Sequence, residues 1–508
     1  DLKARLGMGM LLITHDLGVI AGRADRVLVM YAGKIVEEAP TDELFGRMRH
    51  RYTEALLESI PEVDQDPTHR LTTIPGLPPD LSQPPPGCRF APRCRFAVDR
   101  CRTDEPDLSS DEPAPAPDEG PGTAWSLHRY ACWVPVEPPS DGRRVVVQSG
   151  GLAPDRVPAM VSQEDAPPLM VLEHVVKEFP VTEGVFQRKA GSVKAVSDVS
   201  FEVRRGETFG LVGESGCGKT TVGRLMVALE RPDTGSITFD GVDLSTLRGG
   251  RLREMRRDLQ LIFQDPYASL DPRMRVGPAL REPMVIQGIG SPKDRQTRII
   301  ELLHEVGLSP RAAELYPHEF SGGQRQRIGF ARALTLHPRL IVADEPVSAL
   351  DVSIRSQLLN LMKRLQTDFS LTYLVISHDL SVVRYLADRV GVMYLGKLVE
   401  VGPSRAIYEQ PAHPYTLGLL EAVPVADPGK ERHKDRAAVR GELPSAIDPP
   451  SGCRFRTRCP RAAAICASDE PPLRPFGPDG HLAACHFPLL PPLEPVKGAG
   501  GAGQATGR

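Results

Sequence analysis

A run of eight residues, Gly213-Glu214-Ser215-Gly216-Cys217-Gly218-Lys219-Thr220, fits the pattern G-x-x-x-x-G-K-[ST]. Residues 208–212 before it read as a short apolar strand, and Val222, Leu225, Met226 and Leu229 after it recur at helical spacing. The glycines therefore lie on a strand-to-helix turn, where their backbone freedom lets successive N–H groups point inward and the helix N-terminus adds a positive dipole end. The sequence predicts a nucleotide phosphate site at this turn.

Within this loop we expect Lys219 to reach the β- and γ-phosphates and the Thr220 hydroxyl to bind Mg²⁺. The backbone of the remaining loop residues forms the phosphate cradle. The expected contacts to ATP in this region come from Gly213, Gly216, Gly218, Lys219, Thr220 and Thr221.

Two more segments carry groups suited to phosphate chemistry. The first is Phe320-Ser321-Gly322-Gly323-Gln324-Arg325, and the second is Leu340-Ile341-Val342-Ala343-Asp344-Glu345-Pro346. Four apolar residues that end in two carboxylates are typical of a buried parallel strand with functional groups at its carboxyl end. Asp344 is expected to hold Mg²⁺, and Glu345 can accept a proton from an attacking water. Residues 372–377 predict another apolar strand, which ends at His378.

Taken together, these motifs resemble the nucleotide-binding domain of ABC transporters over residues 169–424. The phosphate loop, Gln264, the signature Ser321 to Gln324, the Asp344-Glu345 pair, Asp351 and His378 occur in the order typical of that family. Phe320 stands where Leu is commoner in the family. The resemblance implies an α/β fold with a P-loop, RecA-like core and a helical subdomain, which we expect between Gln264 and Ser321, where residues 297–306 are amphipathic.

The resemblance also implies roles for single residues. Glu345 is the expected general base, and His378 orients the attacking water. Gln264 reports the γ-phosphate and Mg²⁺ to membrane subunits. Phe179 is a candidate for stacking on adenine, with Phe186 and simple core packing as alternatives. In this family the signature, here Ser321, Gly322, Gly323 and Gln324, contacts the γ-phosphate of ATP held by a facing domain, so hydrolysis needs two cassettes paired head to tail. Asp351 is a further expected contact to ATP.

The start of the chain repeats the end of this cassette. Leu12-Ile13-Thr14-His15-Asp16-Leu17 matches Val375-Ile376-Ser377-His378-Asp379-Leu380, and an offset of 363 positions, as between His15 and His378, continues to Tyr52-Thr53 and Tyr415-Thr416. Unbroken register over some forty residues indicates duplication. We expect residues 1–60 to be the C-terminal part of a first cassette in a tandem precursor, with apolar surface exposed.

Eight of the nine cysteines form two quartets with the repeated spacing C-x5-C-x6-C. They are Cys88, Cys94, Cys101 and Cys132, and Cys453, Cys459, Cys466 and Cys485. Four thiolates can hold zinc or an iron–sulfur cluster, but the tight C-x₂₋₄-C pairs of most structural zinc sites are missing. Disulfides are disfavoured in a protein that works on cytosolic ATP.

The surroundings of these cysteines, Pro86-Gly87-Cys88-Arg89-Phe90 and Ser451-Gly452-Cys453-Arg454-Phe455, resemble the C-terminal extension of oligopeptide and dipeptide importer ATPases, as does His413-Pro414-Tyr415-Thr416. The resemblance implies one [4Fe–4S] cluster per quartet, with zinc, or free or disulfide-bonded thiols, as alternatives. Such a group can simply staple a segment that has too few apolar residues to fold by itself.

Composition agrees with several domains in one peripheral protein. The 508 residues carry a net charge of −3 without a basic run, which gives no electrostatic case for nucleic acid. We expect the first cassette's remnant at 1–60, a Cys-rich extension at 61–140, a linker at 141–168, the complete cassette at 169–424, a second extension at 425–490 and a disordered tail at 491–508.

The predicted function is therefore ATP hydrolysis that drives a peptide-type ABC importer at the cytoplasmic face of the membrane. Its expected partners are two transmembrane permease subunits, a substrate-binding protein and a second cassette, either the missing first copy or another chain. Two alternatives remain: a soluble tandem ABC ATPase outside transport, and an iron–sulfur sensor with a vestigial cassette. The first would be expected to carry basic insertions, and the second should have lost some motif residues.

Overall fold

The structure is a computed structural model that describes residues 5–61, 65–111, 127–137, 167–183, 188–265, 270–434, 439, 441–476 and 480–490. The predicted linker at 141–168 lies outside these ranges except for its last two residues, and the predicted tail at 491–508 lies outside them entirely. No helix in the described ranges is long and apolar enough to cross a membrane.

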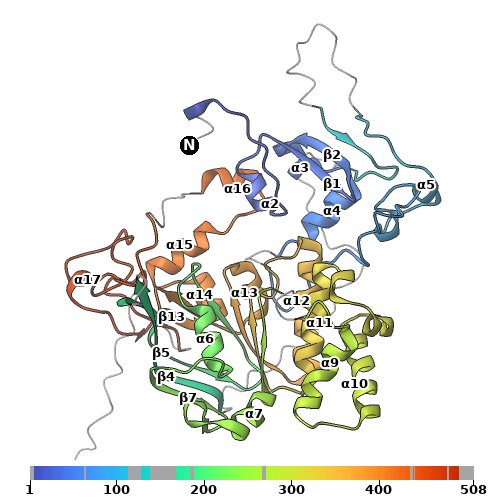
Figure 1. Cartoon of the computed structure of the whole chain (residues 1–508). Coiled ribbons are helices and arrows are strands. Elements are labelled where there is room, and N and C mark those ends of the chain that lie inside the picture. The colour runs from blue at the N-terminus through green and yellow to red at the C-terminus, as the bar shows by residue number, and fades with distance from the viewer. Residues whose placement is uncertain are drawn as a thin grey trace, which may run out of the picture.

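Residues before the linker form short elements (Figure 1). These are α2 (Leu17–Ala21), β1 (Arg26–Tyr31), β2 (Lys34–Pro40), α3 (Thr41–Arg47), α4 (Arg51–Glu58), α5 (Asp99–Thr103) and β3 (Arg129–Tyr130).

The elements after the linker form the larger part of the structure. Its strands are β4 (Pro168–Glu183), β5 (Arg188–Arg204), β6 (Thr208–Val212), β7 (Thr234–Phe239), β8 (Val242–Asp243), β9 (Leu259–Ile262), β10 (Leu340–Asp344), β11 (Thr372–Ser377), β12 (Arg389–Tyr394), β13 (Lys397–Pro403), β14 (Arg474–Pro475) and β15 (Leu482–Ala483). Its helices are α6 (Lys219–Met226), α7 (Gly249–Asp258), α9 (Val276–Ile286), α10 (Pro292–Glu305), α11 (Gly322–Leu334), α12 (Val352–Phe369), α13 (Leu380–Leu386), α14 (Ser404–Glu409), α15 (Pro414–Ala422), α16 (Pro428–His433) and α17 (Ile465–Ser468).

The main sheet has eight strands in the order β14-β15-β13-β12-β6-β11-β10-β9. Strands β12, β6, β11, β10 and β9 run parallel, and every residue of β6, β10 and β11 is buried. The strands predicted at 208–212 and 372–377 are confirmed with the same bounds, and the apolar run at 340–343 forms β10. The predicted apolar face of the first helix is confirmed at Val222, Leu225 and Met226, but α6 ends at Met226 and Leu229 is 50% exposed.

A second sheet, antiparallel with the order β5-β4-β7-β8, packs beside the first. The helical region predicted between Gln264 and Ser321 is confirmed as α9 and α10, which pack with α11 as one side of the molecule (Figure 1). In α10 the buried positions are Ile299, Leu302 and Leu303, which are three and one residues apart and face one side of the helix. The P-loop α/β cassette with a helical part is thus present.

The first copy (residues 5–61) and the segments at 65–111 and 127–137 reproduce part of the second copy. Strands β1, β2 and β3 form an antiparallel sheet in which Glu37 pairs with Tyr130, and β13 pairs with β15 in the same way through Glu400 and Ala483. Both β1–β2 and β12–β13 carry a register shift at the same place, between Val29 and Met30 and between Val392 and Met393. The repeat seen in the sequence therefore extends to strand register.

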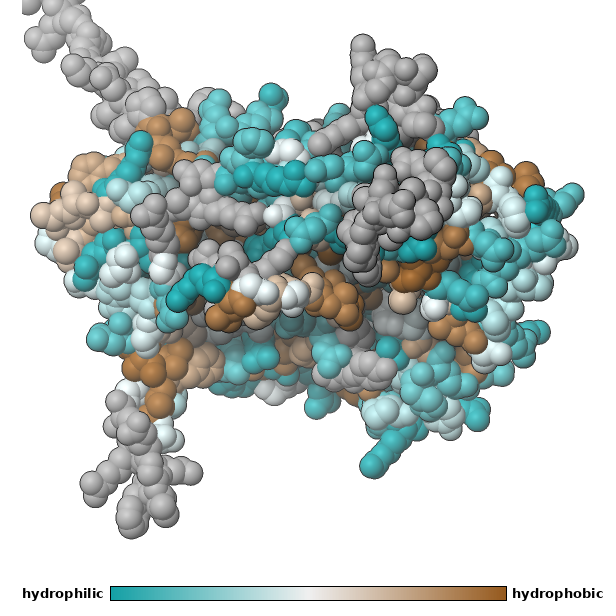
Figure 2. All heavy atoms as spheres, turned by 90° about the horizontal axis from the view of Figure 1, so that it is seen from above, coloured by the Kyte–Doolittle hydropathy of each residue, from teal (hydrophilic) through white to brown (hydrophobic). Residues whose placement is uncertain are grey.

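One equivalent segment differs between the two copies. Residues Leu374 and Ile376 on β11 are fully buried between β6 and β10, whereas their counterparts Leu11 and Ile13 are 84% and 88% exposed. Residues 8–14 form no strand, because no described strand flanks them. Figure 2 looks down on this end of the molecule and shows hydrophobic patches among hydrophilic side chains. The exposed apolar surface predicted for this copy is confirmed.

Residues 65–76, which follow the first copy and which we call the strap, contact the second copy. One face of α12 binds it: Asn360 donates to the carbonyl of Leu71 (2.9 Å) and accepts from its N–H (3.1 Å), and Gln357 donates to the carbonyl of Ile74 (2.7 Å). Lys363 donates to the carbonyl of Pro67. Leu71 is 4% exposed within the core of the second copy. The strap thus ties two parts of the chain that are distant in sequence.

In a second contact between the copies, a segment that follows the second copy reaches the first copy. Arg432 on α16 makes a bidentate ion pair with Asp42 on α3, with nitrogen–oxygen distances of 3.0 Å. At the offset of the repeat, α16 corresponds to the beginning of the strap. In each copy, the segment that follows the equivalent helix, α4 in the first and α15 in the second, therefore contacts the other copy.

Truncating Leu71 tests the strap. Leu71→Ala should lower the free energy of unfolding by about 2–3 kcal/mol, since it removes a buried side chain and leaves a cavity. Leu77→Ala is the matched control, because Leu77 is 49% exposed and should change stability by less than about 0.5 kcal/mol. Urea denaturation of both variants measures the difference, and equal midpoints would show that Leu71 is not docked.

Candidate functional site

The phosphate loop lies between β6 and α6 and requires glycine at two positions. Gly213 and Gly218 have φ angles of 146° and 106°, in the left-handed region. A Cβ atom at Gly213 would lie 2.2 Å from the carbonyl oxygen of Met393, and one at Gly218 would lie 2.0 Å from that of Ala195. The backbone therefore passes too close to its neighbours for any side chain at these two positions.

Lys219 and Thr220 begin α6. The Lys219 ammonium is buried and donates to the carbonyl oxygens of Gly213 (2.7 Å) and Glu214 (2.9 Å) inside the loop. The Thr220 hydroxyl donates to Oδ1 of Asp344 (3.2 Å) at the end of β10. The Lys219 ammonium can exchange these backbone carbonyls for phosphate oxygens of ATP. The Thr220 hydroxyl and the Asp344 carboxylate beside it are suited to bind the Mg²⁺ of Mg-ATP.

Three parallel strands bring the acidic groups and the histidine to this loop. In register, Ser377 of β11 lies opposite Val212 of β6, and Asp344 of β10 lies opposite Ile376. The carboxyl ends of these strands therefore meet at one edge of the sheet. Burial raises the pKa of Asp344, and the nearby Glu345 adds to this, while the Thr220 hydroxyl and Lys219 oppose it. A bound cation would favour the charged carboxylate.

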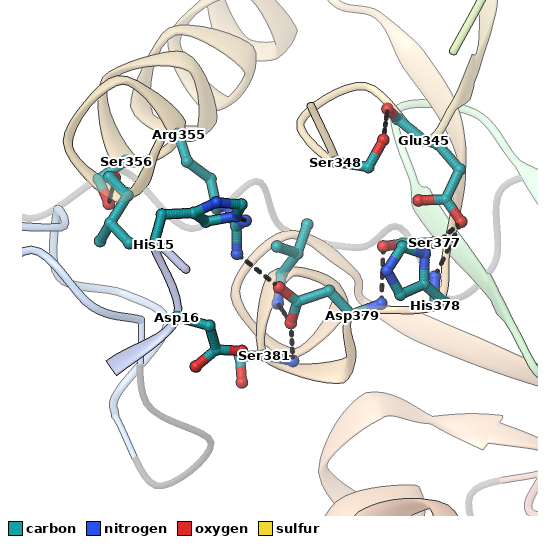
Figure 3. Close-up of polar contacts among 12 residues, drawn as sticks. His15, Asp16, Glu345, Ser348, Arg355, Ser356, Ser377, His378, Asp379 and Ser381 are labelled. Atoms are coloured by element: carbon teal, nitrogen blue, oxygen red, sulfur yellow. Dashed lines mark hydrogen bonds and ion pairs between the residues drawn. The ribbon is translucent and has the colours of Figure 1, made fainter. Parts of the chain in front are cut away.

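Glu345 and His378 form a pair next to Asp344 (Figure 3). Oε1 of Glu345 accepts from the backbone N–H of His378 (3.2 Å) and lies 2.7 Å from its ring Nδ1. The other oxygen, Oε2, is buried without a hydrogen-bond partner among the described residues. Glu345 also has a φ of 50°, an unusual backbone for a non-glycine residue. A buried carboxylate oxygen with free acceptor capacity fits a general base that binds a water.

The signature residues lie on a different element. Ser321 is the N-cap of α11, where its hydroxyl accepts from the N–H of Gln324 (3.4 Å) and Gln324 accepts from the N–H of Ser321 (2.9 Å). A Cβ at Gly323 would meet Ile354 of α12 at 2.2 Å, and one at Gly322 would contact Leu350 at 3.6 Å. The signature thus packs against the start of α12 and presents the exposed Ser321 at a helix N-terminus.

Asp351 caps α12, and Arg355 in the same helix belongs to a network that reaches the first copy (Figure 3). The Asp351 carboxylate accepts from the N–H of Ile354 (2.9 Å), and Arg355, one turn along, pairs with Asp379 at 2.8 Å. Another nitrogen of Arg355 lies 3.5 Å from Nε2 of His15, the counterpart of His378 in the first copy. Sequence reasoning missed Arg355, because the residues it joins are distant in the chain.

Two further predicted site residues are Gln264 and Phe179. Gln264 is exposed just after β9, and the residues that follow it at 266–269 are outside the described ranges. Phe179 is half-buried on β4, opposite Val193, with the Lys177 ammonium 5.4 Å from its ring centroid. Its predicted competitor, Phe186, lies outside the described residues.

Each cysteine quartet is partly buried, and none of the nine cysteines forms a disulfide. The first and third cysteines of each quartet are joined by a backbone hydrogen bond. The N–H of Cys88 donates to the carbonyl oxygen of Cys101 (2.9 Å), and the N–H of Cys453 donates to that of Cys466 (2.9 Å). Burial raises the pKa of Cys94 to about 11 and that of Cys485 to about 12, and the other cysteines of each quartet add to this. No group of three or more His, Cys, Asp or Glu residues in the described ranges is arranged to hold a metal ion.

The fold and the loop geometry define the class as a P-loop ATPase of the ABC cassette type. In agreement, the family model described as ABC transporter matches residues 196–348. The model described as oligopeptide/dipeptide transporter, C-terminal region, matches residues 36–101 and 399–466.

Comparison with similar proteins identifies a narrower group of ABC proteins to which the chain is similar in sequence. The chain is 53% identical to the oligopeptide transport ATP-binding protein AppF of Bacillus subtilis (strain 168), over 63% of this chain and 97% of AppF. It is 46% identical to OppD of Mycobacterium tuberculosis (strain ATCC 25618 / H37Rv), an oligopeptide transport ATP-binding protein, over 84% and 66% of the two chains. Over 88% of its length it is 43% identical to the glutathione import ATP-binding protein GsiA of Escherichia coli (strain K12), and it spans 60% of GsiA. The chain belongs to the family of ABC transporter ATP-binding proteins of the oligopeptide/dipeptide type.

The pair of Glu345 and His378 generates a pH prediction. The hydrogen bond to Glu345 raises the pKa of His378 above its ordinary value of 6.5, with Asp379 adding to the effect, while burial and Lys219 oppose it. Glu345→Gln should therefore lower the pKa of His378, because the main contribution that raises it is lost and burial remains. NMR titration of the His378 ring measures the shift. His337, whose pKa is lowered by burial, is the control and should not move.

Proposed function

We propose that this chain is the ATP-hydrolysing, energy-coupling subunit of an ABC importer for peptides. The observation that carries the proposal is the meeting of Lys219, Asp344, Glu345 and His378 at one edge of the sheet, in a chain whose relatives are named for oligopeptide or glutathione transport. These relatives favour transport over a soluble tandem ATPase or a vestigial sensor, which were the alternatives from sequence.

We assign the following roles at the ATP site. Gly213, Gly216, Gly218 and Thr221 belong to the cradle for the phosphates, and Lys219 binds their oxygens. Thr220 and Asp344 would hold Mg²⁺, with Gln264 as a further ligand; the ion supplies neutralisation of the charge that develops on the phosphates. Phe179 is proposed to stack on adenine.

Glu345 is the proposed general base. Its Oε2 has acceptor capacity to spare among the described residues, so it can bind a water and take its proton. His378 fixes the carboxylate through the bond to Oε1 and orients the water. The left-handed backbone at Glu345 is supported by its N–H, which donates to the carbonyl of Ile376 at 2.9 Å.

A second cassette is expected to complete the site. Ser321 to Gln324 would act on ATP bound to a facing cassette, which is either a first cassette or another chain. The contact of His15 with Arg355 supports a first copy that packs beside the start of α12. We propose that residues 1–60 and 169–424 are the two cassette parts, with extensions at 61–140 and 425–490.

Two permease subunits and a substrate-binding protein are the proposed membrane partners. The helical part around α9, α10 and α11 and the exposed Gln264 beside it are suited to receive a helix from a permease. The chain would then act as a peripheral subunit at the cytoplasmic face of the membrane, where ATP binding and hydrolysis move the permeases.

For the duplicate Cys-rich extensions we propose one [4Fe–4S] cluster per quartet, with zinc as the alternative. Support comes from the repeated C-x5-C-x6-C spacing. A cluster would bind the deprotonated thiolates and tie each extension to its copy.

Substituting the proposed base tests the chemistry. Glu345→Gln keeps the shape of the side chain but cannot accept the proton, so turnover should fall at least about 100-fold while ATP still binds. Lys219→Ala should weaken ATP binding itself. ATPase assays and equilibrium binding separate the two effects, and near-normal turnover of Glu345→Gln with its partner cassette present would reject Glu345 as the base.

Metal analysis tests the cysteines. Anaerobically purified protein should absorb broadly near 400 nm and contain about four iron and four acid-labile sulfide per quartet. Cys459→Ser should lose one cluster and keep the other. One zinc per quartet without sulfide would favour the alternative.

A further inference from the structure

We propose that Arg458, in the second Cys-rich segment, positions the phosphate loop and neutralises a carboxylate within it. This inference rests on the proposed ATP site and adds to it a residue far away in the sequence. Arg458 immediately precedes Cys459, whereas its partner Glu214 is the second residue of the loop.

The contact is a bidentate ion pair. Nη1 of Arg458 lies 2.7 Å from Oε2 of Glu214, and Nη2 lies 2.9 Å from Oε1. The Arg458 side chain is only 8% exposed and that of Glu214 is 27% exposed. An arginine fork that meets both carboxylate oxygens away from bulk water fixes direction as well as distance, which separates it from an ordinary surface ion pair. In keeping with this, the hydrogen bond to Glu214 raises the pKa of Arg458.

The same part of the molecule supports the loop backbone. The N–H of Glu214 donates to the Tyr415 hydroxyl (2.9 Å), and the N–H of Gly396 donates to the carbonyl of Cys217 (2.9 Å). Tyr415 is fully buried and contacts the rings of Tyr394 and Phe455, with centroids 4.7 and 5.3 Å away. Phe455 lies between Cys453 and Arg458, so the Cys-rich segment packs directly behind the loop.

Charge gives the contact its functional meaning. The carbonyl of Glu214 binds the Lys219 ammonium, so the Glu214 backbone lies at the place where the phosphates are expected. An unpaired carboxylate on this residue would repel the several negative charges of ATP. Arg458 cancels that charge from behind and holds the carboxylate in place.

The first Cys-rich segment provides an internal comparison. Arg93 precedes Cys94 as Arg458 precedes Cys459, but the first copy contains no phosphate loop in this chain. Arg93 donates instead to the carbonyl oxygens of Pro75 (2.9 Å) and Ile74 (3.3 Å) in the strap. The same position therefore binds neutral carbonyls where no loop is present and a loop carboxylate where one is.

A double-mutant cycle tests the proposal in the full chain, with the dissociation constant of Mg-ATP as the readout. Arg458→Gln should weaken ATP binding about tenfold, because it leaves Glu214 charged and unpaired. Glu214→Gln/Arg458→Gln should recover most of that loss, and Arg458→Lys should recover part of it. The loss in Arg458→Gln should also shrink at high salt, as expected for repulsion between charges.

The control is Arg456→Gln, two residues away, since Arg456 donates to Ser451 (2.9 Å) in its own segment and should leave the affinity unchanged. The proposal is overturned if Arg458→Gln binds ATP as tightly as wild type, or if the double variant is as weak as Arg458→Gln, which would indicate a merely structural arginine. Failure of the ATP site itself gives a different result: wild type and Lys219→Ala would then bind ATP equally poorly.

Discussion

The structure depends on the close approach of the phosphate loop to two carbonyl oxygens that come from different sheets. Ala195 lies on β5 of the antiparallel sheet, and Met393 lies on β12 of the main sheet. The loop therefore sits where the two sheets meet, and only glycine at Gly213 and Gly218 lets it do so. Once the loop is fixed there, the parallel register of β6, β11 and β10 brings His378, Asp344 and Glu345 to the same edge.

Comparison of the two copies shows that a central strand forms only where neighbouring strands flank it. Leu11-Leu12-Ile13 and Leu374-Val375-Ile376 are almost the same in sequence, yet only the second is a strand. A central parallel strand has both backbone edges and both faces covered, and in the first copy no described strand supplies that cover. By contrast, β1 and β2 form a hairpin with each other and keep even the register shift of β12 and β13, because an antiparallel pair needs only local contacts.

This difference also explains what could be predicted from the sequence. The strands at 208–212 and 372–377 were predictable because apolar runs and flanking motifs are local signals, and the ATP-site residues followed from motif order. Leu229 was misassigned because helical spacing alone does not show where α6 ends. The contacts of Arg355 with His15, of Asn360 with Leu71 and of Arg458 with Glu214 join residues more than 240 positions apart, and no local pattern encodes such pairs.

Helix α12 contacts both the candidate site and the first part of the chain. Its first turn carries Asp351 and Arg355, and Arg355 holds Asp379, which caps the helix that follows His378. Its outer face binds the strap, and Arg355 near its start contacts His15, so this one helix meets the first part of the chain at two places. Packed helices move as rigid bodies more readily than they bend. The contact of Arg355 with His15 and the contacts of the strap therefore lie on one rigid helix, which also carries the ion-pair partner of Asp379, the residue beside His378.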